Sequence, residues 1–108
     1  MEKLYHATLK ENLISIYDNG IKRGWDGLVY TCDNPNDALK FLALRAMAEN
    51  KEVVVIEIFT KYLNESKLQD GMDHNPSFFG NPVVKTYPED IPTKALGQYF
   101  EAERRKSK

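Results

Sequence analysis

One apolar segment constrains the fold of this chain more than any other. Residues 52–59 read Glu-Val-Val-Val-Ile-Glu-Ile-Phe, and β-branched side chains of this kind favour extended backbone. A nearly continuous apolar run of this length is typical of a strand that is covered on both faces. We therefore predict a central β-strand here, buried on both faces for part of its length.

Three other segments are rich in β-branched and aromatic residues, as strands are. The last of them begins with Pro82, which a strand tolerates at its first position because no ladder donor is needed there. We predict strands over residues 3–7, 28–31 and 82–87.

Helices are predicted where apolar residues recur at every third or fourth position. Leu9, Leu13 and Ile16 share one helical face, and Asn19-Gly20 supplies the left-handed turn that often ends a helix. Asp33-Asn34-Pro35 is a helix-start signal. We predict helices over residues 9–19, 35–49 and 95–105.

Strands and helices in this order predict an α+β fold, a mixed β-sheet with flanking helices packed against it. A length of 108 residues, with hydrophobic residues at 42% of the total, suits a single domain with a real core. We expect that domain to span residues 1–108, with residues 97–108 forming a C-terminal helix or a frayed tail.

Charge and cysteine content limit the setting of the protein. A formal net charge of -1 gives no reason to expect nucleic acid from the whole-chain balance. Cys32 is the only cysteine, no signal peptide opens the chain, and no apolar run is long enough to cross a bilayer. We predict a soluble cytoplasmic protein with no membrane partner.

Two residues stand out as candidates for binding a ligand. His6 lies in or at the end of the first predicted strand, where it is either satisfied by a backbone carbonyl or an anchor for a polar ligand. Tyr30 is either ordinary strand packing or a ring that stacks on a flat ligand. The second interpretation of Tyr30 rests on its place between a glycine-containing loop and a helix start, because ligands often meet strand ends there.

Other residues carry weaker signals. No His is placed beside Cys32 by the sequence, so an inert small residue explains it better than a nucleophile does. Asp73 and His74 lack the spacing of a metal site, and we expect no metal. The basic tail that begins at Arg104 is typical of a solvated chain end, and neither a P-loop nor a dinucleotide-binding glycine motif is present.

Several short motifs together resemble the small bacterial and phage members of the ADP-ribosyltransferase-like superfamily. The resemblance covers residues 4–96, and its motifs are moderately specific. They are Leu4-Tyr5-His6-Ala7-Thr8, Asn12-Leu13 with Ile16, Asn19-Gly20-Ile21, Val29-Tyr30-Thr31-Cys32, Asp37-Ala38 with Phe41, the Val53–Ile58 strand, Asp73-His74 and Tyr87-Pro88-Glu89-Asp90-Ile91-Pro92.

The resemblance implies a split, twisted sheet with NAD, used as a substrate, bound in a cleft between the two halves. In the His-Tyr-Glu type, the His holds the adenosine ribose and the Tyr stacks on nicotinamide, roles that fall by position on His6 and Tyr30. By the same analogy Thr8 and Gly20 shape the cleft floor, and Thr31 joins the cofactor-binding residues.

The third motif of that type is a Glu that supports the oxocarbenium-like transition state. This chain has Asn81 near the expected place, and Asn81 carries no charge. We assign Asn81 and Glu89, with Tyr30, as the candidate catalytic residues, and Asp90 and Glu57 are other carboxylates that could substitute.

Four functions follow as hypotheses. The first is an ADP-ribosyltransferase-like protein that uses NAD to modify a protein or nucleic acid, a macromolecular acceptor whose identity the sequence does not give. The second is a catalytically degenerate module of the same fold that binds a nucleotide or a protein. The third, an RNA 2′-phosphotransferase-like enzyme, needs cleft arginines, and only Arg23 and Arg45 precede the tail. The fourth is a plain interaction domain.

Overall fold

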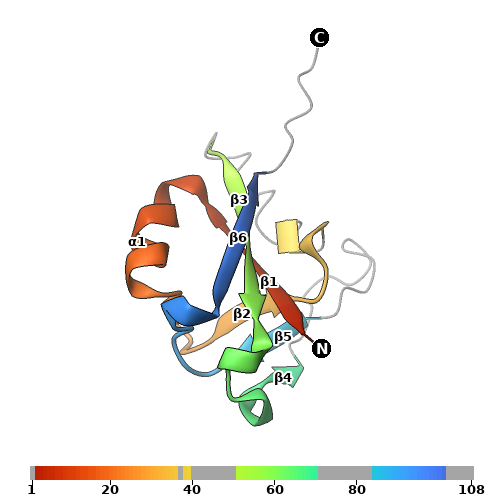
Figure 1. Ribbon diagram of the computed structural model, residues 1–108. Helices are drawn as coiled ribbons and strands as arrows, with labels where there is room; N and C mark the ends of the chain where they lie inside the picture. Colours follow the sequence, from red (N-terminus) through yellow and green to blue (C-terminus); the bar gives the residue numbers. More distant parts are fainter. Residues whose placement is uncertain (1, 37, 40–50, 71–83, 102–108) are drawn as a thin grey trace.

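The computed structural model describes residues 2–36, 38–39, 51–70 and 84–101. Six strands form one sheet in the order β4-β5-β2-β1-β3-β6 (Figure 1). The strands are β1 (Lys3–Leu9), β2 (Val29–Cys32), β3 (Val53–Phe59), β4 (Gln69–Asp70), β5 (Val84–Tyr87) and β6 (Leu96–Glu101). The helix α1 spans Leu13–Asn19, and 3₁₀ turns span Lys10–Asn12, Thr60–Tyr62, Glu65–Lys67 and Thr93–Ala95. Within these ranges, no helix has the length and apolar composition that crossing a bilayer requires.

The central strand predicted from the apolar run is confirmed as β3. It lies between β1 and β6, and every residue from Val53 to Ile58 is buried. β3 pairs with β1 along its whole length, from Lys3↔Phe59 to Leu9↔Val53. A strand with neighbours on both edges and apolar cover satisfies its backbone groups without water, which the Val/Ile-rich sequence requires.

The sheet divides between β1 and β2. These two strands are in register at one residue pair, Tyr5↔Cys32, whereas β2 and β5 pair at four positions from Val29↔Tyr87 to Cys32↔Val84. The two halves of the sheet, β4-β5-β2 and β1-β3-β6, therefore meet along a short contact.

Strand alternation sorts the core into two layers, because successive side chains point to opposite faces. α1 covers one face, and the helical residues 35, 36, 38 and 39 lie on the other (Figure 1). The α1 layer contains Leu4, Ile16, Ile21, Val29, Ile56, Ile58, Leu63, Tyr87, Ile91 and Ala95. The opposite layer contains Cys32, Ala38, Val55 and Val84, with Tyr5, Ala7 and Leu39 packed against it.

The other predicted strands are confirmed within two residues at each end where they are described. β1 extends the predicted 3–7 segment to Leu9, and β2 is shifted by one residue from 28–31. Residues 82 and 83 lie outside the described part, and β5 begins at Val84.

The first predicted helix, residues 9–19, is wrong at residue 9 and helical from residue 10, with a 3₁₀ turn over Lys10–Asn12 and the α-helix over Leu13–Asn19. Leu9 belongs to β1, because it pairs with Val53 and because Lys10 N–H donates to the Glu52 carbonyl at 2.9 Å. The α-helix begins at Leu13 and ends at Asn19. Gly20 follows at the predicted position with a positive φ of 86°, but its ψ of 175° is extended and differs from that of the predicted left-handed turn. Ile21 then pairs with Ile91 through two backbone hydrogen bonds of 2.8 and 2.9 Å.

Two predictions about the fold are wrong. The sheet is not mixed, since all five strand pairings are antiparallel. Residues 96–101 are not helical but form β6, because pairing with the buried β3 overrides the helical interpretation of the segment. Of the predicted 35–49 helix, the described part includes an Ala38 N–H to Asn34 carbonyl hydrogen bond of 3.1 Å, and residues 40–50 lie outside it, as do residues 102–108 of the tail.

Replacing Gly20 with Ala is expected to destabilise the fold more than replacing Gly27 does. Both glycines have a φ near +80°, a conformation that costs an L-residue about 1–2 kcal/mol. A Cβ on Gly20 would also lie 2.3 Å from the Ile91 carbonyl oxygen, whereas a Cβ on Gly27 meets nothing within 4 Å. Urea unfolding of both variants measures the difference, and an equal loss in free energy of unfolding would contradict the close approach of Gly20 to Ile91.

Candidate functional site

A cavity of about 190 Å³ lies where β1 and β2 part. Three consecutive residues from each of the two strands contribute to its lining. The lining residues are Tyr5, His6 and Ala7 of β1, Tyr30, Thr31 and Cys32 of β2, and Ala38.

His6 spans the gap between the two strands. Its Nδ1 lies 2.8 Å from the backbone carbonyl oxygen of Tyr30. A carbonyl oxygen only accepts, so Nδ1 carries the proton and donates it. The sequence analysis left two roles open for His6: a histidine satisfied by a backbone carbonyl, or an anchor for a polar ligand. The contact with Tyr30 matches the first role. Because His6 also lines the cavity, the second role stays open.

The protonation of the His6 ring follows from its surroundings. Desolvation in the cavity lowers the pKa of His6 below 6.5, and the hydrogen bond to Tyr30 opposes that shift only in part. The ring is therefore neutral at neutral pH, with the proton on Nδ1 and a lone pair on Nε2. Within the described residues the ring makes no other hydrogen bond, so the Nε2 lone pair is an unused hydrogen-bond acceptor.

Tyr30 is held from outside the cavity by Asp26. The Tyr30 hydroxyl donates to Asp26 Oδ2 at 2.7 Å, and the ring is 37% exposed. The hydrogen bond to Asp26 raises the pKa of Tyr30, and the same bond lowers the pKa of Asp26. The sequence analysis did not identify Asp26, although its place in a Gly-Trp-Asp-Gly turn four residues before Tyr30 was a usable signal.

Thr31 and Cys32 complete the β2 wall. The Thr31 hydroxyl donates to the Lys85 carbonyl at 2.9 Å and is almost fully buried, so it joins β2 to β5. The Cys32 thiol is buried beside the cavity.

Two of the predicted cofactor-binding residues lie outside the lining of the cavity. The Thr8 hydroxyl accepts from Asn12 Nδ2 at 3.1 Å, which ties β1 to the turn that follows it. Gly20 ends α1 against the Ile91 carbonyl. Both residues support the frame around the cavity.

The predicted carboxylates are engaged elsewhere. Glu89 pairs with Lys67 at 3.1 Å and lines a separate groove with Tyr62 and Lys94. Asp90 shares that groove and accepts from the backbone N–H and Nε of Arg23 at 2.9 and 3.2 Å.

The pKa of Asp90 is lowered mainly by the Arg23 backbone hydrogen bond. Glu57 is buried on β3 and pairs with Lys3 at 3.2 Å. Asn81, Asp73, His74 and Arg45 lie outside the described residues.

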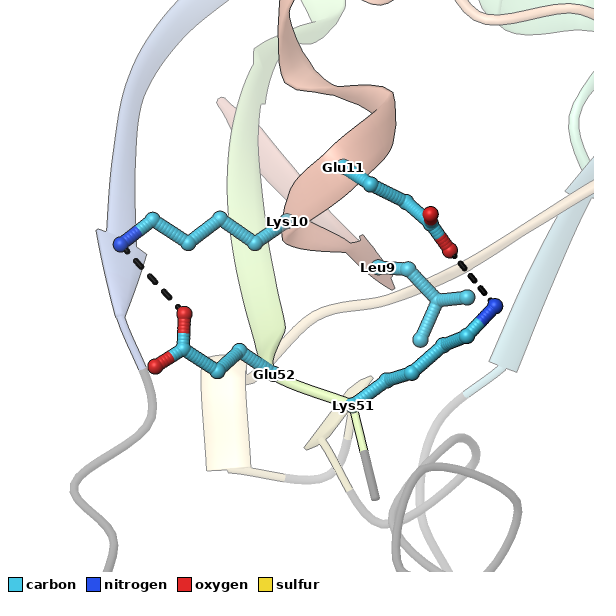
Figure 2. A pocket seen from close by; sticks show the side chains of 5 residues that line it. All are labelled: Leu9, Lys10, Glu11, Lys51 and Glu52. Carbon is cyan, nitrogen blue, oxygen red and sulfur yellow. Dashed lines mark hydrogen bonds and ion pairs between the residues drawn. The ribbon is translucent and has the colours of Figure 1, made fainter. Parts of the chain in front are cut away.

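Another groove, of about 330 Å³, lies at the end of β1, away from these residues (Figure 2). Figure 2 shows its charged side chains pointing toward one another in pairs. Lys51 lies 2.8 Å from Glu11, and Lys10 lies 3.5 Å from Glu52. These ion pairs join the end of β1 to the start of β3. Because each positive charge has a negative partner, the groove offers no single sign of charge to a ligand.

Within the described ranges, no three His, Cys, Asp or Glu side chains lie close enough together to hold a metal ion.

No protein-family model matches this chain, and no curated protein is significantly similar to it.

The His6 ring is expected to titrate below pH 6.5 as the Nδ1–H tautomer. Long-range ¹H–¹⁵N NMR over pH 4–8 measures both properties, and His6→Gln assigns the signals because the chain has two histidines. A lowered folded-state pKa means that the unfolded ring takes up its proton first as the pH falls. The neutral His6 ring therefore contributes fully to the free energy of unfolding above pH 6.5, and this contribution is lost as the pH falls through the folded-state pKa. An Nε2–H tautomer, or a pKa at or above 6.5, would contradict the geometry.

Proposed function

We propose that this chain is an ADP-ribosyltransferase-like protein that binds NAD in the cavity between β1 and β2 and uses it to modify a protein or nucleic acid. One observation carries the proposal: the 2.8 Å contact between His6 Nδ1 and the Tyr30 carbonyl brings the His and the Tyr together at the split of the sheet. The resemblance of the sequence requires that same pairing.

The chemistry of the cavity suits a nucleoside. His6 Nε2 is an acceptor, and ribose hydroxyls are donors. The half-exposed Tyr30 ring offers a flat apolar surface to a heteroaromatic ring. By the resemblance, the ribose that bonds to His6 is that of adenosine and the ring that stacks on Tyr30 is nicotinamide, so the two residues would hold opposite halves of NAD.

The size of the cavity limits what it holds. At about 190 Å³ it is smaller than the roughly 300–1,000 Å³ typical of sites for a drug-sized ligand. The cavity therefore encloses only part of the dinucleotide, and the rest of NAD extends beyond it.

A second function, a binding module without transfer activity, is favoured by the placement of the carboxylates. Glu89 and Asp90 face a groove separate from the cavity, and Glu57 pairs with Lys3. A transferase stabilises the cation that develops on the ribose with a nearby negative charge. Turnover of NAD decides between the two functions.

Calorimetric titration with NAD and ADP-ribose tests the binding. We expect His6→Ala to weaken NAD binding about fivefold to tenfold, because a neutral hydrogen bond contributes about 1 kcal/mol. Glu11→Gln, in the groove of Figure 2, is the matched control and should bind as the wild type does. No heat of binding with NAD, or equal affinity of wild type and His6→Ala, would overturn the site.

Labelled NAD incubated with cell lysate then separates the two functions. Transfer of label that His6→Ala reduces supports the transferase. Binding without consumption of NAD supports the module.

A further inference from the structure

The turn before β2 holds one carboxylate in a defined place beside Tyr30. The Gly24 N–H donates to the Leu28 carbonyl at 2.9 Å, and the Gly27 N–H donates to the Gly24 carbonyl at 3.0 Å. Leu28 N–H donates to Asp26 Oδ1 at 3.1 Å, while Oδ2 accepts from the Tyr30 hydroxyl at 2.7 Å. Both oxygens of Asp26 are therefore oriented by the turn and by Tyr30.

The charge of Asp26 is not neutralised by a neighbour. No Lys or Arg within the described residues forms an ion pair with it, and the nearby Lys22 and Arg23 pair with Asp90 instead. Its pKa is lowered, chiefly by the Tyr30 hydrogen bond, so the carboxylate is ionised at neutral pH. A full negative charge, that of Asp26, therefore lies next to the hydroxyl end of the Tyr30 ring.

The side-chain groups of His6 and Tyr30 that are left for a ligand are hydrogen-bond acceptors. The proton of the Tyr30 hydroxyl is committed to Asp26, so the phenolic oxygen presents only lone pairs to a ligand. His6 Nδ1–H is committed to the Tyr30 carbonyl, so Nε2 is also an acceptor. A ligand ring stacked on Tyr30 would have the phenolic oxygen and the Asp26 carboxylate, which lies outside the cavity, at one end of the tyrosine ring.

We propose that Asp26 is a specificity-determining and positioning residue, which makes the site select a cationic ring that carries a hydrogen-bond donor. The site would then bind NAD, which has a carboxamide, more tightly than the nicotinic acid form of the dinucleotide. This inference rests on the proposed function. The nicotinamide ring of NAD is a cation with an NH₂ donor. The nicotinic acid ring replaces that donor with a carboxylate, which leaves the ring with no net charge and places two anions close together. A site built from acceptors rejects a ligand that lacks the matching donor.

The test compares the affinities of NAD and nicotinic acid adenine dinucleotide by calorimetry. We expect the wild type to bind NAD roughly tenfold or more tightly than the acid. Asp26→Asn removes the charge and should reduce that ratio toward one, while Asp18→Asn, which removes the same charge from the exposed face of α1, should leave it unchanged.

A second measurement does not depend on any ligand. The Asp26 hydrogen bond raises the pKa of Tyr30. The tyrosinate absorbance of Tyr30, which is identified by its loss in Tyr30→Phe, should therefore appear at lower pH in Asp26→Asn than in the wild type. Unfolding curves for Asp26→Asn that match those of the wild type would show that the variant is folded.

The outcomes separate the two proposals. A wild type that binds both dinucleotides equally, or an Asp26→Asn ratio equal to that of the wild type, overturns this inference and leaves the proposed function standing. A wild type that binds neither dinucleotide overturns the proposed function and this inference with it. An unchanged Tyr30 titration in Asp26→Asn also overturns the inference.

Discussion

The burial of β3 is the constraint on which the rest of this structure depends. An apolar strand of seven residues cannot leave either edge or either face to water. β1 and β6 satisfy its two edges, α1 covers one face, and the residues around Ala38 lie on the other. Because β1 is aligned with β3 along its full length, the position of His6 is set by the most deeply buried part of the molecule.

The candidate site arises where that order is interrupted. β2 is aligned with β5 and leaves β1 after one register pair, so the two halves of the sheet separate beside Tyr5 and Cys32. His6 crosses the gap through its Nδ1–H, and both His6 and Tyr30 line the cavity there. A rigid scaffold on one side and a short turn containing Asp26 on the other are a common arrangement for a binding site.

The sequence predicted those elements whose pattern is local. The Val/Ile run predicted β3, the spacing of Leu13 and Ile16 predicted α1, and Gly20 predicted its end. β6 was predicted as a helix because its strand character comes from pairing with β3, and neither that pairing nor the antiparallel direction of every strand is written in a local pattern.

The same limit applies to the site. His6 and Tyr30 were predicted to act together, and the structure places them in one cavity. Glu89 was assigned a catalytic role as a substitute for the missing third-motif Glu, yet its carboxylate pairs with Lys67 and lines another groove. Asp26 was not identified because its contact with Tyr30 depends on how the Gly24–Gly27 turn folds.

Mapping NAD onto the folded protein tests the central claim most directly. In a titration followed by two-dimensional amide NMR, we expect the largest chemical-shift changes at Tyr5, His6 and Ala7 of β1 and at Tyr30, Thr31 and Cys32 of β2. Shift changes confined to the groove of Glu89 and Lys94, or to that of Lys10 and Glu52, would contradict the claim that the split of the sheet is the nucleotide site.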